Sequence, residues 1–392
     1  MLLKSIQLTH FLSYGETTGI VELKPLNVLI GPNGSGKSNL IEAIDLLHST
    51  PSTSDKSNLL AAISEGGGVG DWLWKGGQRS PSARIDVVVA NPKGPADLRY
   101  ALGFTEMGQR FAIVDERIEN EKPDVGHTKP YFYYRFENGH GVLNVKGDER
   151  RLRHEDIDPT ASILSQRKDP DQYPELTYLG QAFAKMRLYR EWSFGRNTAA
   201  RGPQNTNMPN EYLEPDASNL GLVLNRLRRE PAVKKQFLDA LRALYDGIDD
   251  FDVQIERGTV QVFFQEGRYT VPATRLSDGT LRYLSLLAIL CHPSPPPLVC
   301  IEEPELGLHP DVLPTLATLL KEAAQRTQLI VTTHSDILVD ALTDVPEAVL
   351  VASRDENGTR LERLDAEKLK PWLEQYRLGQ LWTRGEIGGT RW

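Results

Sequence analysis

The sequence predicts an α/β fold: a mixed or parallel sheet core that carries an antiparallel β meander and helical insertions. One observation is a short apolar run at 27–30 that leads through a glycine-rich loop into an amphipathic segment at 38–48. A second is the alternation of helix and strand patterns from residue 277 onward, which is typical of parallel sheets. A third is a series of β-branched and aromatic segments between residues 83 and 146, separated by short polar turns.

The N-terminal region of the chain is expected to lead into a phosphate-binding loop. Residues 2–30 contain three short strand candidates, and the last of them, 27–30, is apolar enough to be buried. Residues 31–38 read Gly-Pro-Asn-Gly-Ser-Gly-Lys-Ser and match the pattern G-x-x-x-x-G-K-[ST]. The predicted helix at 38–48 follows directly, so its N-terminus and the N–H groups of the loop would face a bound phosphate.

This loop supplies the groups that a nucleoside triphosphate requires. Lys37 would reach the β- and γ-phosphates, and the hydroxyl of Ser38 would hold Mg²⁺. A glycine-rich turn with a surface lysine is the alternative, but the strand and the helix on either side favour phosphate binding. The expected nucleotide-binding residues of the loop are Asn33, Gly34, Ser35, Gly36, Lys37, Ser38 and Asn39.

Between this loop and residue 277 the sequence predicts insertions. Residues 49–81 are rich in Ser, Gly and Pro, with one weak helical patch near 57–64, and 147–172 and 195–216 are expected to be irregular. The strands of the meander are expected at 83–90, 97–105, 109–118, 129–137 and 141–146. Helices are expected at 174–186, 219–229 and 231–245, a strand at 187–194, and further strands near 251–256, 259–265 and 268–272.

The whole chain is expected to form one composite domain built from three segments. Because residues 1–50 supply too few strands for a parallel sheet, the two ends of the chain must share the core. Residues 1–150 would hold the phosphate loop and the meander, and residues 151–270 would form a helical and β insertion facing a partner or DNA. Residues 271–392 would complete the core with the remaining motifs and a C-terminal tail.

Three further motifs follow in the C-terminal segment. An apolar strand ends in Glu302 and Glu303: the first can orient Mg²⁺ through its water shell, and the second can act as general base or orient the attacking water. Another buried strand ends at His334, which could donate a hydrogen bond to the γ-phosphate. Ser277 and Gly279 stand at a helix start, which suits an anion site but also a plain N-cap with a turn glycine.

Along the chain the four motifs follow in the order phosphate loop, Leu-Ser-x-Gly signature loop, acidic strand and histidine. This order resembles that of the head ATPases of the ATP-binding cassette (ABC) type. Within that superfamily the chain is most similar to the RecF/SMC-like branch, which includes predicted ATPases of bacterial defence systems and the ATPase domains of OLD nucleases. The resembling segments are 8–14, 31–43, 276–280, 302–310 and 332–336, with 372–382 similar to stand-alone members.

The resemblance implies an ABC-type P-loop NTPase that hydrolyses ATP with Mg²⁺. Lys37, Glu303 and His334 would act in catalysis, and Ser38 and Glu302 would hold the metal. The Ser and Gly of the signature loop would cap the γ-phosphate of an ATP held by a second subunit. The active unit would then be a head-to-tail homodimer around two ATP molecules.

Two residues depart from the family's pattern, and one element of the pattern is not placed. Glu302 stands where an Asp is usual, and Asp278 adds a negative charge between the signature Ser and Gly. The family's glutamine loop has two candidates, Gln166 and Gln181.

The favoured function is an ATP-dependent switch that controls a separately encoded effector protein in bacterial defence. The alternative is a DNA-binding repair ATPase that resembles RecF, and a transporter subunit is favoured least. An SMC-type tether is excluded because no long coiled coil is predicted, and the 58 residues after His334 (392 − 334 = 58) are too few for the TOPRIM nuclease domain of OLD proteins. Candidate DNA contacts, which a solvated helix face explains more often, are Arg226, Arg228, Arg229, Lys234 and Lys235, or Arg150, Arg151 and Arg153.

Composition bounds these functions further. The formal net charge of −8 provides no global positive field for nucleic acid. The two cysteines, Cys291 and Cys300, fit a reducing cytoplasm better than a disulfide scaffold. Since no apolar run approaches about 18 residues, a cytoplasmic location without membrane contact is expected. Trp72, Trp74 and Trp392 are candidate partner contacts.

Overall fold

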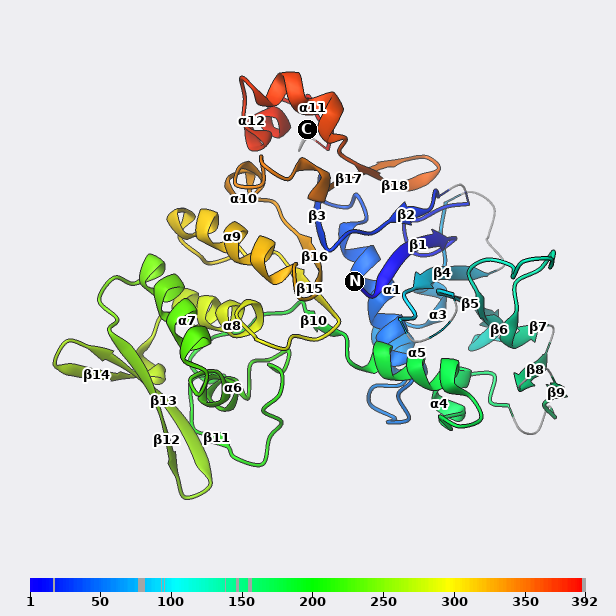
Figure 1. The fold of residues 1–392 in the computed structure, drawn as a ribbon, viewed down its shortest axis with the longest axis horizontal. Helices are drawn as coiled ribbons and strands as arrows, with labels where there is room; N and C mark the ends of the chain where they lie inside the picture. Colours follow the sequence, from blue (N-terminus) through cyan, green and yellow to red (C-terminus); the bar gives the residue numbers. More distant parts are fainter. Residues whose placement is uncertain are drawn as a thin grey trace.

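The structure is a computed structural model that describes residues 1–16, 18–76, 82–92, 94, 96–137, 139–145, 148–153 and 157–389, with the backbone alone at 148 and 149. A mixed sheet lies at the centre of the molecule, with an antiparallel sheet on one side and a second β and helical insertion on the other (Figure 1). This arrangement confirms the predicted α/β fold. Of the helices in the described ranges, none is long and apolar enough to cross a bilayer.

Both ends of the chain contribute to the central sheet. Its described strands are β3 (Leu26–Ile30), β10 (Arg187–Tyr189), β15 (Leu298–Glu302), β16 (Gln328–Thr332), β17 (Val349–Asp355) and β18 (Gly358–Arg363). Their order is β10-β15-β16-β3-β17-β18, parallel from β10 to β17 and antiparallel at β18. β15, β16 and β3 are buried along nearly their whole length, as expected of parallel strands covered on both faces.

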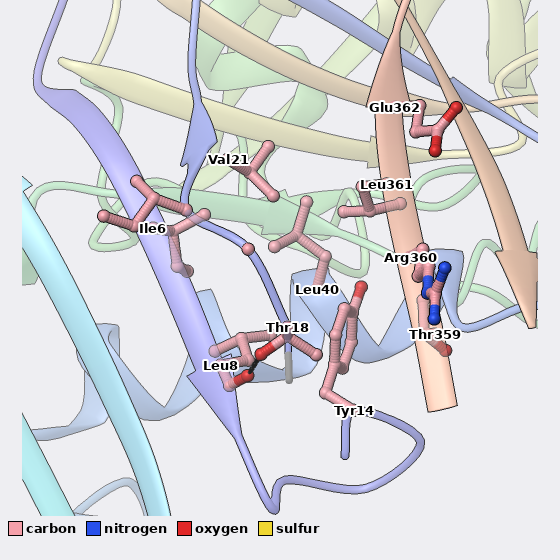
Figure 2. A pocket seen from close by; sticks show the side chains of 12 residues that line it. Ile6, Leu8, Tyr14, Thr18, Val21, Leu40, Thr359, Arg360, Leu361 and Glu362 are labelled. Carbon is pink, nitrogen blue, oxygen red and sulfur yellow. Dashed lines mark hydrogen bonds between the residues drawn. The ribbon is translucent and has the colours of Figure 1, made fainter. Parts of the chain in front are cut away.

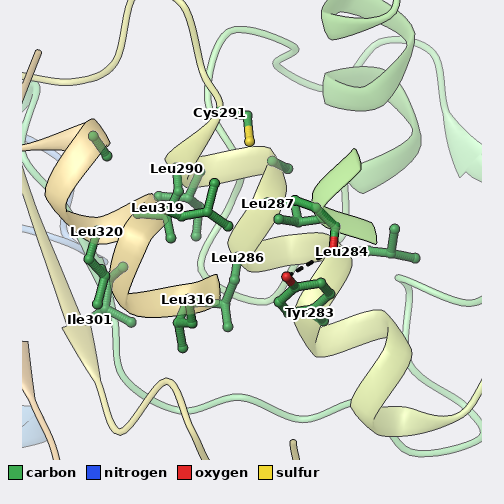
Figure 3. Close-up of a cluster of buried hydrophobic side chains, with 14 of the residues drawn as sticks. Tyr283, Leu284, Leu286, Leu287, Leu290, Cys291, Ile301, Leu316, Leu319 and Leu320 are labelled. Atoms are coloured by element: carbon green, nitrogen blue, oxygen red, sulfur yellow. Dashed lines mark hydrogen bonds between the residues drawn. The ribbon is translucent and has the colours of Figure 1, made fainter. Parts of the chain in front are cut away.

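Successive residues of the central strands face two different hydrophobic clusters. Val299 and Ile301 belong to the cluster that contains helix α8 (Asp278–Leu290). Cys300 belongs to the cluster that contains helix α1 (Lys37–Ser49). Because neighbouring residues of a strand point to opposite faces, α1 and α8 cover opposite faces of the central sheet. Figure 3 shows the α8 side, where leucines of α8 and of the following helix pack near Ile301.

The antiparallel sheet contains the predicted meander. In the described residues its order is β2-β1-β4-β5-β6-β7-β8-β9. Its strands are β1 (Leu3–Thr9), β2 (Val21–Glu22), β4 (Ala83–Val89), β5 (Leu98–Met107), β6 (Arg110–Asn120), β7 (Phe132–Glu137), β8 (His140–Val145) and β9 (Asp148–Arg151). β9 lies in a segment that was expected to be irregular. Its sequence, Asp-Glu-Arg-Arg, has little strand propensity, so its conformation depends on pairing with β8 at the sheet edge.

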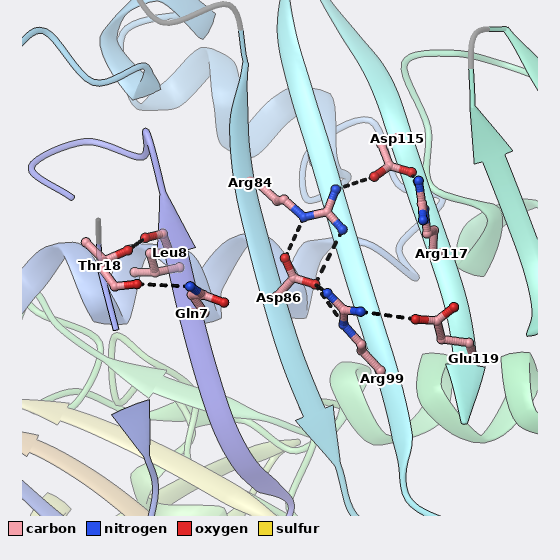
Figure 4. A network of polar contacts seen from close by, with 9 residues as sticks. All are labelled: Gln7, Leu8, Thr18, Arg84, Asp86, Arg99, Asp115, Arg117 and Glu119. Carbon is pink, nitrogen blue, oxygen red and sulfur yellow. Dashed lines mark hydrogen bonds and ion pairs between the residues drawn. The ribbon is translucent and has the colours of Figure 1, made fainter. Parts of the chain in front are cut away.

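The outer face of this sheet carries a ladder of alternating charges (Figure 4). Arg84 on β4 binds Asp86 on the same strand, and Arg99 on β5 binds Asp86 at 2.7 Å and Glu119 at 3.2 Å. Arg84 also contacts Asp115 on β6. Each guanidinium in the ladder faces a carboxylate, so this broad surface offers little net positive charge to a nucleic acid.

The second insertion combines a small sheet with two helices. Its described elements are β11 (Gln204–Asn205), α6 (Leu220–Leu227), α7 (Pro231–Leu244), β12 (Asp250–Glu256), β13 (Thr259–Glu266) and β14 (Tyr269–Pro272). The predicted helices and the three later strands are confirmed. The segment 195–216 was expected to be a loop throughout, but β11 within it pairs with β13.

The remaining described helices are short, apart from α5 and α9. They are α2 (Leu59–Glu65), α3 (Val69–Trp72), α4 (Ile163–Gln166), α5 (Pro174–Ala184), α9 (Leu313–Ala323), α10 (Asp336–Asp340), α11 (Ala366–Leu373), α12 (Leu378–Thr383) and the 3-10 turns η2 (Ala273–Arg275), η3 (Pro310–Val312) and η4 (Pro346–Ala348). α9 follows β15 and leads into β16, which gives the helix–strand alternation that the sequence predicts.

Candidate nucleotide-binding site

The phosphate loop joins β3 to α1 and packs against the β17–β18 hairpin. Gly31 and Gly36 have φ angles of 146° and 96°, in the region that favours glycine. A Cβ atom at Gly31 would lie 2.3 Å from the carbonyl oxygen of Ala352, and one at Gly36 would lie 2.2 Å from Oγ1 of Thr359. These glycines therefore allow both the curl of the loop and its close approach to the hairpin.

Lys37 is folded back onto its own loop. The residue is 6 % exposed, and Nζ donates hydrogen bonds to the carbonyl oxygens of Gly31 at 2.8 Å and Pro32 at 3.0 Å. Burial lowers the pKa of Lys37 to about 8, and the negative charge of Glu303 opposes this shift. The ammonium group thus lies within the loop predicted to hold phosphate.

The other predicted loop residues differ in their surroundings. Asn33, Gly34 and Ser38 are exposed. Ser35 is buried, and its Oγ has no hydrogen-bond partner among the described residues. Nδ2 of Asn39 donates to Oγ of a serine in the preceding loop, Ser13, at 2.7 Å. Asn39 therefore connects α1 to that loop.

Three side chains that sequence reasoning did not select support the phosphate loop. Oγ1 of Thr359 lies 2.7 Å from Oγ of Ser13 and 2.9 Å from the carbonyl oxygen of Ser35. The hydroxyl of Tyr14 donates to the carbonyl oxygen of Gly36 at 3.0 Å. Tyr14 also lines a mainly apolar cavity of about 280 Å³ between β1, β2, α1 and β18 (Figure 2). The loop is thus fixed from β18 and from the segment after β1.

A cleft of about 320 Å³ opens beside the phosphate loop. Trp74 and Arg354 line it, with the guanidinium carbon 5.8 Å from the centre of the indole ring. Arg354 also donates to the carbonyl oxygen of Gly34 at 3.4 Å, and Ser13 and Asn39 complete the wall next to the loop. An aromatic ring, a cation and polar groups next to a phosphate site suit the base and ribose of a nucleotide.

The acidic strand places Glu302 beside a cation. Oε2 of Glu302 accepts a hydrogen bond from Nε of Arg190 at 3.1 Å, and Arg190 also donates to Oε1 of Glu42 at 2.5 Å. Oε1 of Glu302 is buried and has no partner within the described ranges. Burial raises the pKa of the neighbouring Asp45 to about 6, and Arg190 opposes this shift. Arg190 directly follows β10, so the edge of the central sheet positions it.

Oxygen atoms of Glu302 and Ser38 fit a magnesium ion that is held together with a nucleotide. The unpartnered oxygen of Glu302 and the exposed hydroxyl of Ser38 are the kind of ligand that Mg²⁺ prefers. The portion of the chain that the structure describes contains no cluster of three or more His, Cys, Asp or Glu residues suited to a metal ion. A magnesium ion here would therefore take its other ligands from phosphates and water.

Glu303 and His334 lie together at the ends of neighbouring strands. Nε2 of His334 is 3.5 Å from Oε1 of Glu303, as the parallel pairing of β15 and β16 places them. Glu303 has a φ of 45°, a conformation that costs a non-glycine residue about 1 kcal/mol or more. Its N–H donates to the carbonyl oxygen of Thr332 at 3.0 Å, and its own carbonyl accepts from Arg282 of α8 at 3.2 Å. These contacts hold the strained residue in place.

The signature loop forms the N-terminus of α8. Oγ of the exposed Ser277 accepts a hydrogen bond from the N–H of Thr280 at 3.1 Å, so the plain N-cap expected as an alternative is present. A Cβ atom at Gly279 would lie 2.5 Å from the carbonyl oxygen of Gly307, so packing against the loop after β15 requires glycine here. An anion site at this helix start would share Ser277 with the cap.

Asp278 is neutralised within the chain by Arg201, which the sequence did not point to. The guanidinium contacts the carboxylate of Asp278 and donates to the carbonyl oxygens of Leu276 at 2.5 Å and Phe194 at 2.9 Å. The departure from the family's signature is therefore compensated by a side chain from the segment that follows β10.

Comparison with known proteins gives the family. Residues 26–340 match the family model described as "AAA domain, putative AbiEii toxin, Type IV TA system". The chain belongs to this family. It is an ABC-type ATPase head of the RecF/SMC-like branch.

Curated relatives share short segments with this ATPase. It is 50 % identical over 42 residues to "Chromosome partition protein Smc" of Synechococcus sp., which is 11 % of this chain and 4 % of that protein. It is 30 % identical over 131 residues to "DNA replication and repair protein RecF" of Cyanothece sp., which is 32 % of this chain and 29 % of that protein. The matches thus span less than a third of the length of either relative.

Solved structures share the fold over nearly the whole chain. The Smc head bound to the C-winged helix domain of ScpA has a TM-score of 0.59 at 14 % identity and covers 94 % of this chain and 99 % of that one. The Pyrococcus furiosus Smc head with an extended coiled coil, bound to the C-terminal domain of ScpA, has a TM-score of 0.57 at 14 % identity and covers 96 % and 99 %. At this identity the likeness concerns the fold of the ATPase alone.

Neither glutamine-loop candidate contacts the site of this ATPase within the described residues. The side chain of Gln166, the last residue of α4, is hydrogen-bonded to the backbone of Asp158 and Ala161 before that helix. Gln181 is exposed on α5. The side chain that reaches Glu302 from the end of β10 is Arg190. Sequence reasoning predicted a strand here but could not tell which strand would lie beside it.

Several candidate partner contacts of the ATPase are already engaged. Arg228 pairs with Asp252, and Lys234 pairs with Asp250 at 2.7 Å, so two of the proposed DNA contacts are neutralised. Trp72 is 3 % exposed and donates to the carbonyl oxygen of Ile63 at 3.0 Å; its prediction as a partner contact was wrong. Trp74 instead lines the cleft described above, and Trp392 lies outside the described residues.

Proposed function

We propose that this ATPase works as an ATP-dependent switch in which two copies close head to tail around two ATP molecules. One observation carries the proposal: the phosphate loop opens into α1 and the signature loop opens into α8, on opposite faces of the central sheet. Because α1 and α8 cover different faces, we infer that the two loops of one chain serve different nucleotides. A second copy, turned to face the first, supplies the missing loop to each site.

Within each site, the chain's residues divide the work. Lys37 leaves the carbonyl oxygens of its loop for the β- and γ-phosphates, and the base and ribose occupy the cleft of Trp74 and Arg354. Ser38 and Glu302 would hold Mg²⁺, which would supply neutralising charge. Glu303 orients and deprotonates the attacking water, and the neighbouring His334 donates a hydrogen bond to the γ-phosphate.

The partner's loop completes the site. Ser277 and Gly279 of the second copy cap the γ-phosphate with the N-terminus of α8. Arg201 keeps Asp278 from repelling that phosphate, because it neutralises the carboxylate in its own chain. Hydrolysis removes the group that both copies bind, so it opens the dimer.

We further propose that the closed dimer controls a separately encoded effector in bacterial defence. The description of the matched family, which names a toxin and a toxin–antitoxin system, supports this. Similar Smc heads are seen bound to a partner protein. This chain has two surfaces that can carry a partner, namely the antiparallel sheet and the segment 151–270. The RecF-like alternative is less well supported because the charge ladder and two of the basic residues of the helices are neutralised.

The decisive experiment is the mass in solution of the Glu303→Gln variant with and without ATP and Mg²⁺. Loss of the general base is expected to trap ATP and convert monomers into dimers. Adding Ser277→Arg to this variant should prevent the dimer but leave one ATP bound per chain, and the exposed Glu356→Gln is the matched control. If ATP binds and the mass never changes, the sandwich is wrong. If ATP does not bind, the assignment of the phosphate loop is wrong.

A further inference from the structure

A buried carboxylate ties together the two loops that carry Glu303 and His334. Oε1 of Glu305 accepts a hydrogen bond from Oγ1 of Thr333 at 2.7 Å and another from the backbone N–H of His334 at 2.7 Å. Oε2 of Glu305 is buried with no partner among the described residues. One oxygen of Glu305 therefore fixes the backbone on which the histidine stands.

Thr333 closes this arrangement from the other side. It is fully buried, and its N–H donates to the carbonyl oxygen of Leu29 on β3 at 3.1 Å. Its hydroxyl accepts from the N–H of Ser335 at 3.0 Å and donates to Glu305. The backbone on both sides of His334 is thereby held by one connected set of hydrogen bonds that includes β3, the strand that leads into the phosphate loop.

We propose that Glu305 is a positioning residue for ATP hydrolysis, which holds the backbone of His334 so that the imidazole faces Glu303 and the γ-phosphate. The imidazole lies 3.5 Å from Glu303, at the limit of a direct contact, so a small shift of the backbone separates the two groups. Glu305 touches neither nucleotide nor metal in this assignment. The inference rests on the proposed roles of Glu303 and His334.

A positioning role for Glu305 predicts a loss of kcat without a matching change in the KM for ATP. A misplacement of about 1 Å in a catalytic group can lower the rate by about 10²-fold. Glu305→Ala is therefore expected to lower kcat by about 10- to 100-fold while changing the KM for ATP by less than about threefold. Glu305→Gln keeps an acceptor oxygen and should retain kcat within about threefold of the wild type.

The His334→Ala variant tests whether Glu305 acts through the histidine. If it does, Glu305→Ala should cost little further activity in the His334→Ala protein, because the group it positions is already gone. If the losses of activity in the two single variants multiply in the double variant, the proposal is overturned. Equal impairment of Glu305→Gln and Glu305→Ala would also overturn it. Glu356→Ala is the matched surface control.

A measurement without nucleotide separates this inference from the proposed function. Amide hydrogen exchange of the segment 332–336 should be faster in Glu305→Ala than in the wild type and unchanged in Glu305→Gln. If the wild-type protein does not hydrolyse ATP, the proposed function is wrong, yet the exchange still reports whether Glu305 holds His334. Unchanged exchange in Glu305→Ala would overturn the inference whatever the activity.

Discussion

Lys37 shows how a single residue can be prepared for a ligand. Its ammonium group is buried and bound to carbonyl oxygens, which satisfy its donors without neutralising its charge. Burial therefore lowers its pKa from 10.5 to about 8. Stability is given up at this position so that a cation is present where phosphates would bind.

The sign of this effect can be measured. Between pH 8 and 10.5 the unfolded chain holds a proton on Lys37 that the folded chain has released, so folded-state stability should rise with pH in this window. The Lys37→Met variant lacks this gain and should be more stable than the wild type at pH 7 by roughly 1 to 3 kcal/mol. Thermal unfolding of both proteins at pH 7, 8, 9 and 10 checks this, and a constant difference across the series would contradict it.

At the scale of one element, α8 depends on a side chain from a distant segment of the chain. Its first residue, Asp278, is neutralised by Arg201, and its signature glycine packs against the loop after β15. Arg282, one turn further along α8, donates to the carbonyl oxygen of Glu303. The signature helix and the loop of the proposed general base are thus in contact within one chain.

Removing Arg201 should expose the charge of Asp278 at the dimer interface. In the Glu303→Gln background, Arg201→Ala is expected to weaken ATP-driven dimerisation by about tenfold, which corresponds to about 1.4 kcal/mol. Adding Asp278→Asn should restore most of the affinity, because the charge that Arg201 compensates is then absent. Sedimentation of the single and double variants measures this. Failure of Asp278→Asn to rescue the dimer would show that Arg201 acts through the backbone alone.

For the molecule as a whole, the two faces of the central sheet predict sites shared between copies. Lys37→Ala and Ser277→Arg should each abolish hydrolysis when the variant is present alone. A mixed dimer contains one site in which the phosphate loop and the signature loop are both intact. Mixing equal amounts of the two variants should therefore restore hydrolysis that neither variant shows alone. If mixing the two variants restores no ATP hydrolysis, the proposal that each site is shared between two copies is contradicted.

Features that depend on residues close together in the chain could be predicted from the sequence, and features that depend on residues far apart in the chain were missed. Local patterns indicated the phosphate loop, the strands of the meander and the acids at the end of β15, because strand and loop formation there depends on neighbouring residues. Arg190 and Arg201 were missed because their partners, Glu302 and Asp278, lie far along the chain. β9 and β11 were missed because polar strands this short are fixed by their partner strands alone.

The position of β3 in the central sheet also constrains the order of events during synthesis. β3 leaves the ribosome early, but its partners in that sheet are β16 (Gln328–Thr332) and β17 (Val349–Asp355). The strand that carries the phosphate loop therefore waits, unpaired and apolar, until most of the chain has been made. Such long-range pairing slows folding and prolongs the exposure of an aggregation-prone strand. A nascent chain that stops before residue 328 would possess the phosphate loop and still lack both strands that flank β3.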